Sequence, residues 1–347
     1  MPQKSRTARG PAWAAFDDEQ LLNLRFKDLK LKIAGTWLED RLAALQSELD
    51  ARRLRVRPHA WLSTEWFSPH DTPGIAVPFY LAHPRLARLE RKMMHEVEGG
   101  TVRDCMRILR HEAGHVVQRA FGLHRRRRWR ELFGPASKPY PDHYRPNPAS
   151  RRYVQHLRRW YAQCHPDEDF AETFAVWLTP QSGWRKRYAD WPALKKLEYV
   201  DDLMGELAGM KPPAKPRTQM EPLRALNTTL AEHYREKRER FAVEAPSVFD
   251  RDLLRIFAAD AGHRNAPLAS TMIRRHRRKI MRAVARWTGE YPLALDAALD
   301  DIVDRSRILK LRAVGSESRM RMELTALLTT KAVTSLYSAG RRQTFAV

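Results

Sequence analysis

Residues 101–122 read TVRDCMRILRHEAGHVVQRAFG, and the organisation of the chain follows from this stretch. Thr101 and Asp104 have the spacing of a capping box, which predicts the first turn of a helix. Gly122 is a natural end for the same helix, because glycine adopts the left-handed conformation at no steric cost. Between these two ends, apolar residues recur every three or four positions, which predicts one buried face. These residues are Met106, Leu109, Ala113, Val116, Val117, Ala120 and Phe121.

The same helix carries the motif His-Glu-Ala-Gly-His at 111–115. His111 and His115 are four residues apart, so both imidazoles face the same side of the helix. Two nitrogen ligands in this arrangement suit one Zn²⁺ ion. Glu112 is displaced by one position around the helix. It can therefore reach a metal-activated water as general base without binding the metal itself.

A catalytic zinc site needs a third protein ligand, which we expect from a second, downstream helix. Residues 167–178, DEDFAETFAVWL, form such a segment. Glu168 is our candidate metal ligand, and Glu172, four residues later, is our candidate acceptor for the outer N–H of a ligand histidine. These two roles can be exchanged, and Asp169 is a weaker candidate. The alternative is an ordinary acidic helix start that complements the helix dipole.

Together, HEAGH and HPDEDFAETFAVWL (165–178) resemble the zinc-binding metallopeptidases of bacteria, a gluzincin-like group. Three further segments agree: RPHAWLSTEWFSP (57–69), GIAVPFYLAHPRL (74–86) and WPALKKLEYVDDLM (191–204). The resemblance covers about residues 17–241. It implies a zincin-like fold, one zinc ion on His111, His115 and Glu168, and Glu112 as the base. Some relatives carry an N-terminal cysteine zinc ribbon, which this chain lacks.

The Glu-x-x-x-Glu spacing is also similar to that of anthrax lethal factor. In that metallopeptidase, a tyrosine seven residues before the ligand glutamate points to the zinc site. Tyr161 stands seven residues before Glu168. This resemblance makes Tyr161 a candidate donor to the developing oxyanion. The alternative is an aromatic side chain packed beside Trp160.

The rest of the pattern predicts an α+β protein that is mostly helical. We expect a basic disordered tail (1–16), a zincin-like metallopeptidase domain with a small β-sheet (17–210), a linker and associated helix (211–241), and a basic all-α C-terminal extension (242–347). The strand 74–81 contains Pro78, so we expect it at the sheet edge. The resemblance to zincins implies that this edge pairs with an extended peptide; the alternative is a plain edge strand. Residues 124–148 read as a loop, and 151–161 as a helix.

The chain of 347 residues has a formal net charge of +22. This excess indicates either an acidic or nucleic-acid partner or a solvated basic surface. Residues 125–128 are four arginines that either rim the cleft, where they would favour acidic substrates, or form a solvated loop. Residues 274–279, RRHRRK, lie on a predicted amphipathic helix that could bind nucleic acid or pack with its charged face outward.

The two cysteines, Cys105 and Cys164, exclude a cysteine zinc ribbon and are expected as buried thiols. No signal peptide and no membrane span is visible, so the expected location is the cytoplasm. The function that we predict is zinc-dependent hydrolysis of peptide bonds in a peptide or protein substrate. Two alternatives remain open: a basic, helical, nucleic-acid-associated protein with a non-catalytic zinc, and a zinc hydrolase that acts on a non-peptide amide.

Overall fold

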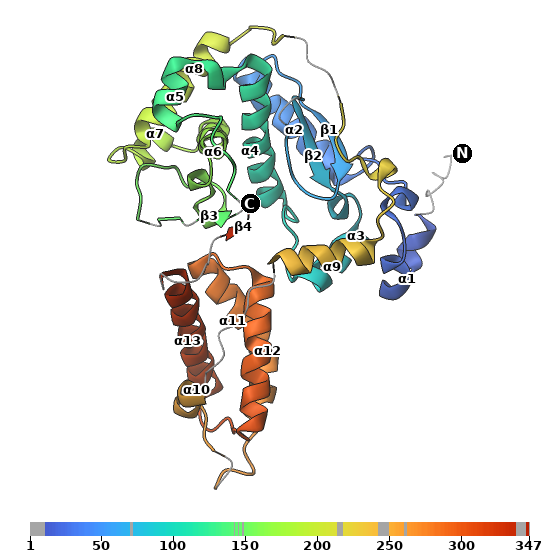
Figure 1. Ribbon diagram of the computed structural model, residues 1–347, viewed down its shortest axis with the longest axis vertical. Helices are drawn as coiled ribbons and strands as arrows, with labels where there is room; N and C mark the ends of the chain where they lie inside the picture. Colours follow the sequence, from blue (N-terminus) through green and yellow to red (C-terminus); the bar gives the residue numbers. More distant parts are fainter. Residues whose placement is uncertain are drawn as a thin grey trace, which may run out of the picture.

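The computed structural model describes residues 11–69, 72–141, 143–144, 146–147, 149–213, 218–241, 250–259, 262–337 and 345–346. Most of these residues are helical (Figure 1). The helices are α1 (Asp18–Leu22), α2 (Trp37–Ala51), α3 (Pro84–Met94), α4 (Val102–Phe121), α5 (Arg127–Phe133), α6 (Pro166–Leu178), α7 (Trp184–Arg187), α8 (Leu194–Leu207), α9 (Leu230–Phe241), α10 (Asp250–Ile256), α11 (Ala269–Thr288), α12 (Pro292–Ile308) and α13 (Glu317–Tyr337).

Helix α4 begins and ends where the sequence predicts. The Thr101 hydroxyl accepts a hydrogen bond from the Asp104 N–H, and Gly122 ends the helix with φ 62°. The helix runs through the middle of the upper part of the molecule in Figure 1, with α6 on one side and α2 and the sheet on the other. Its apolar side chains belong to the largest hydrophobic core. A helix buried on nearly all sides can place ionisable groups inside the protein.

The sheet beside α4 consists of two parallel strands, β1 (His59–Ser63) and β2 (Gly74–Pro78). The predicted strand 74–81 is therefore too long, because residues 79–82 form a 3-10 turn. Every residue of β2 is buried. On the side away from β1, the N–H of Ala76 donates to the carbonyl of Phe67. Phe67 therefore occupies the outer edge of β2 at that position, and pairing of this strand with a peptide stays a prediction.

The described residues form two large hydrophobic cores. The first core belongs to the main lobe, which we define as the elements from the N-terminus to α9. The second belongs to the C-terminal lobe, which we define as α10 to α13. Figure 1 shows this lobe, in orange and red, below the main lobe. Leu293, at the start of α12, packs into the first core, so the two lobes are in direct contact.

Two further expectations for the segment after α4 are wrong. The segment 124–148 includes a helix, α5, because Trp129 and Phe133 are buried against the aromatic ring of Phe170. Residues 151–157, by contrast, are not helical, and 158–163 form a kinked 3-10 turn. The helix expected in the linker region, 211–241, is α9, which covers only Leu230–Phe241.

Some expectations lie outside the described residues. These are most of the expected tail at 1–16, the centre of the linker at 214–217, and the start of the C-terminal extension at 242–249. Residues 345–346 pair in antiparallel fashion with His143–Tyr144. Cys105 and Cys164 are both buried, unpaired thiols, as the sequence predicts. Within the described ranges, no helix has the length and apolar composition that a membrane span requires.

Candidate metal centre

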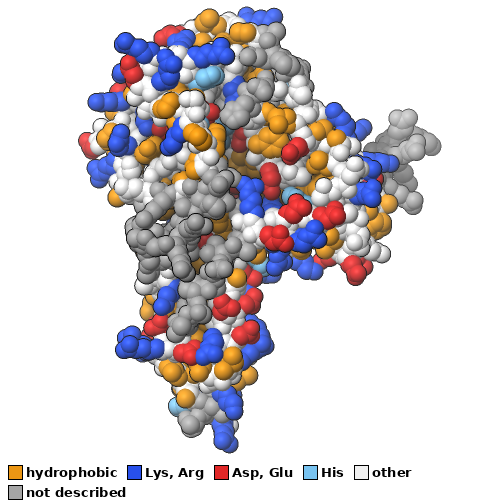
Figure 2. Space-filling view, in the orientation of Figure 1, with side chains coloured by type: hydrophobic (Ala, Val, Ile, Leu, Met, Phe, Trp, Pro, Cys, Tyr) orange, Lys and Arg blue, Asp and Glu red, His pale blue; other side chains and the backbone are white. Residues whose placement is uncertain are grey.

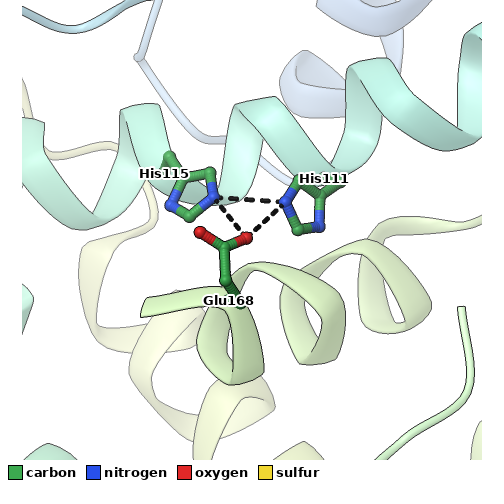
Figure 3. A group of neighbouring side chains, drawn as sticks. All are labelled: His111, His115 and Glu168. Carbon is green, nitrogen blue, oxygen red and sulfur yellow. Dashed lines mark hydrogen bonds and ion pairs between the residues drawn. The ribbon is translucent and has the colours of Figure 1, made fainter. Parts of the chain in front are cut away.

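The approach of α4 to α6 is unusually close at one point. A Cβ atom added to Gly114 would lie 2.8 Å from the Cα atom of Ala171 and 3.1 Å from its carbonyl oxygen. No real side chain fits at such distances, so only glycine permits this contact. The close contact brings His111 and His115, on either side of Gly114, directly opposite Glu168 (Figure 3).

The three side chains converge on one point. The Nε2 atoms of His111 and His115 are 3.2 Å apart, and Oε2 of Glu168 is 2.9 Å from the first and 3.2 Å from the second. Ligands that sit about 2.0–2.1 Å from a tetrahedral zinc ion are separated by roughly 3.3 Å. The triangle therefore has the size of three positions of a zinc tetrahedron. All three residues are buried.

Two members of this cluster, His111 and Glu168, are held from behind, whereas Nδ1 of His115 has no hydrogen-bond partner among the described residues. Nδ1 of His111 is 2.9 Å from Oε1 of Glu172, whose other oxygen accepts a hydrogen bond from the N–H of Leu157 at 2.8 Å. The Tyr140 hydroxyl donates to Oε1 of Glu168 at 2.8 Å, which leaves Oε2 of that carboxylate to face the histidines. Such outer contacts fix the orientation of metal ligands. In this structure Glu168 forms one corner of the triangle, and Glu172 lies behind His111.

The electrostatics of the cluster favour a cation. Burial opposes protonation of His111, but its hydrogen bonds to Glu168 and Glu172 outweigh this effect and raise its pKa well above the usual value. Burial also disfavours the charged form of Glu168, but the neighbouring His115 and the hydrogen bonds to both imidazoles lower its pKa well below the usual range. Two buried carboxylates thus face two imidazoles, and the cluster attracts protons or a metal ion.

Glu112 has a different environment from the ligand triangle. Its side chain is only 6% exposed, and its Oε2 atom has no hydrogen-bond partner among the described residues. Burying a carboxylate oxygen without a partner is costly. Glu112, the triangle and Tyr161 all line a single cleft of about 550 Å³. The unpaired carboxylate is therefore available to a molecule bound in this cleft.

Tyr161 lies beside the ligand triangle, as the resemblance implied, but Tyr140 makes the closer contact with a member of the triangle. The ring of Tyr161 is 5.7 Å from the ring of His111, measured between centroids. Burial, together with the charge of Glu168, raises its pKa well above the usual value, so its hydroxyl keeps its proton. Tyr140 stacks on His165 at 3.8 Å and binds Glu168 directly. Sequence reasoning missed Tyr140, because no motif spacing links it to the two helices.

The other candidates have structural partners. The Asp169 carboxylate pairs with the Lys196 ammonium at 2.5 Å and does not face the triangle. His165 accepts a hydrogen bond from the Asp167 N–H and so caps α6. The side chain of His143 lies outside the described residues. We therefore assign none of these residues to the metal centre.

The arginine run 125–128 does not line the cleft. Arg126 instead pairs with Glu206 on α8, at 2.6 Å. The cleft lining includes several carboxylates, of which Glu98 has no ion pair among the described residues. Glu98 lines the cleft, and desolvation together with the charges of Glu65 and Glu96 raises its pKa to about 7. The four arginines are therefore not part of the cleft lining, which contains basic side chains such as Lys237 as well as acidic ones.

Comparison with known proteins supports the resemblance. Residues 69–183 match the family model described as "putative zinc-binding metallo-peptidase". The match spans α4 and α6 and contains the whole ligand triangle, but it is shorter than the region 17–241 over which we saw the resemblance. No curated protein and no solved structure matches the chain.

Proposed function

We propose that this protein is a zinc-dependent peptidase. The observation that carries the proposal is the convergence of three buried ligand atoms, from His111, His115 and Glu168, at the spacing of a zinc tetrahedron. Three protein ligands leave one position open, as catalytic zinc sites require. We also propose that residues 17–210 form a zincin-like domain, with the C-terminal extension starting near residue 242.

Zinc in this position would polarise the scissile carbonyl and lower the pKa of a water molecule. Glu112 would take a proton from that water and pass it to the leaving amine. The unpaired Oε2 atom of Glu112 supports this role, since no described residue of the protein competes for it. Tyr161 would donate a hydrogen bond to the oxyanion, and Glu172 would hold His111 in the tautomer that directs Nε2 to the metal.

The experiment compares Glu112→Gln with Glu198→Gln, an exposed position on α8, in the full-length, zinc-loaded protein. Both variants should retain zinc. Because a general base contributes about 10²–10⁴-fold, hydrolysis of a peptide library should fall by at least about 100-fold in Glu112→Gln alone. Undiminished hydrolysis in that variant would refute the proposed mechanism. Cleavage of non-peptide amides but not of peptides by the wild type would refute the substrate class and leave the zinc chemistry.

A further inference from the structure

The cleft has walls from both lobes. Tyr291, Pro292 and Leu293, at the start of α12, line the same 550 Å³ cleft as Glu112 and the ligand triangle. Figure 1 shows the C-terminal lobe against the main lobe near α9. Sequence reasoning treated the C-terminal extension as a separate basic module. The structure instead brings its second long helix to the candidate active site.

One side chain ties the two lobes together at the cleft. Arg159 donates from Nε to the carbonyl of Gly289 at 3.0 Å, and its guanidinium lies 3.5 Å from the centre of the Tyr291 ring. The carbonyl of Arg159 in turn accepts a hydrogen bond from the Tyr144 hydroxyl at 2.8 Å. A second tie is the hydrogen bond between Nε2 of His95 and Oδ2 of Asp296, at 3.0 Å.

The backbone at this tie is strained. Arg159 and Trp160 have φ values of 62° and 53°, in the left-handed region that residues other than glycine rarely occupy. Such strain persists only when surrounding contacts impose it, and it is concentrated at functional sites. The two strained residues directly precede Tyr161. The contacts of the C-terminal lobe with Arg159 therefore help to set the position of Tyr161 in the cleft.

We propose that the C-terminal lobe is the second wall of the substrate cleft, that Tyr291 contacts the bound substrate, and that Arg159 is a positioning residue which holds this wall against the segment of Tyr161. This inference rests on the proposed peptidase function. A cleft between two lobes accepts an extended segment of polypeptide more readily than a folded domain. The substrate class is therefore an unfolded or extended peptide, packed in part on the Tyr291 ring.

The first test measures binding, without turnover, in the zinc-loaded Glu112→Gln protein. The probe is unfolded, fluorescein-labelled casein, and the readout is fluorescence anisotropy. Adding Tyr291→Ala should raise the Kd about ten-fold, the effect of losing a central aromatic contact. Adding Tyr291→Phe, which keeps the ring, should change it less than about two-fold. The control is Trp287→Ala, a 74% exposed tryptophan on α11 of the same lobe.

A second test needs no substrate. Arg159→Ala should speed amide hydrogen exchange both at residues 157–163 and at residues 289–293, because the tie between them is lost. Unchanged exchange at either segment would overturn the role of Arg159. An unchanged Kd in Tyr291→Ala, with casein still bound, would overturn the substrate contact alone. Failure of the zinc-loaded protein to bind casein at all would count against the peptidase proposal. Hydrogen exchange would still decide whether Arg159 holds the C-terminal lobe against the segment of Tyr161.

Discussion

Helices α4 and α11 are both twenty residues long, and both carry histidine and arginine, yet they place these residues oppositely. In α4, His111, Glu112 and His115 all point into the protein and are nearly inaccessible to solvent. In α11, Arg274 and Arg278 are exposed, while apolar residues face the second core. The two helices thus show ionisable groups inside and outside a hydrophobic interior.

The difference teaches which charged residues carry information about function. A buried ionisable group is costly unless another group compensates it, so the polar cluster on α4 requires a partner such as a cation. Charges on the outer side of α11 cost little. Some arginines of α11 also form ion pairs within the C-terminal lobe: Arg275 pairs with Glu317, and Arg277 pairs with Asp296 and Asp300. In Figure 2, basic side chains on the visible face are spread over both lobes among acidic ones rather than gathered in one patch.

The largest effect should come from the inner groups. Glu168→Gln should abolish tight zinc binding, because an amide is a poor zinc ligand. Glu172→Gln should weaken binding by about 10–100-fold, as expected of a residue that only orients a ligand. Glu198→Gln, outside the site, is the matched control. Competition with a metal chelator measures all three affinities. The opposite order for Glu168 and Glu172 would exchange their roles.

The next effect concerns the contact that brings the inner groups together. Gly114→Val should destabilise the protein by on the order of 2 kcal/mol, because the new side chain overlaps the backbone at Ala171. Gly205→Ala on α8 is the control, since a Cβ there meets nothing within 4 Å. That substitution should stabilise α8 by about 0.5–1 kcal/mol. Chemical denaturation measures both, and a neutral Gly114→Val would show that α4 and α6 need not approach so closely.

An effect of similar size should appear as a pH dependence of stability. His156 hydrogen-bonds the carbonyl of Arg107 on α4, and burial lowers its pKa to about 4. An unfolded histidine has a pKa of about 6.5, so the unfolded state binds more protons between these values. The stability from keeping His156 neutral is complete above about pH 6.5 and is lost as the pH falls toward 4.

The size of this contribution is about 3 kcal/mol, since one pKa unit is worth about 1.4 kcal/mol. Urea denaturation of metal-free protein at pH 7 and pH 4.5 should therefore show a steeper loss for the wild type than for His156→Gln. Parallel losses in the two proteins would mean that His156 is protonated in the folded state.

The smallest effect is expected on the outer face of α11. Replacing both Arg274 and Arg278 with alanine should change stability by no more than about 0.5 kcal/mol, as is usual for exposed positions. Titration with duplex DNA at low and moderate salt tests the alternative function. A salt-dependent affinity that the double variant loses would give α11 a nucleic-acid role.

The sequence predicted the local features of the candidate site well, because they depend on residues close together along the chain. Thr101 and Gly122 bound α4, and the four-residue spacing puts both histidines on one face. The predictions failed where contacts between distant segments determine the position of a residue. The Glu168–Tyr140 bond and the docking of Tyr291 at the cleft join segments far apart in sequence, and no periodicity reports them.

The central claim is that a single buried cluster on α4 and α6 binds one catalytic zinc ion. The most direct test is elemental analysis of zinc in the full-length protein, alongside His115→Ala, after dialysis against buffer with trace zinc. We predict one zinc ion per chain in the wild type and none in the variant. A wild-type protein without zinc, or a His115→Ala protein that still holds one ion per chain, would contradict it.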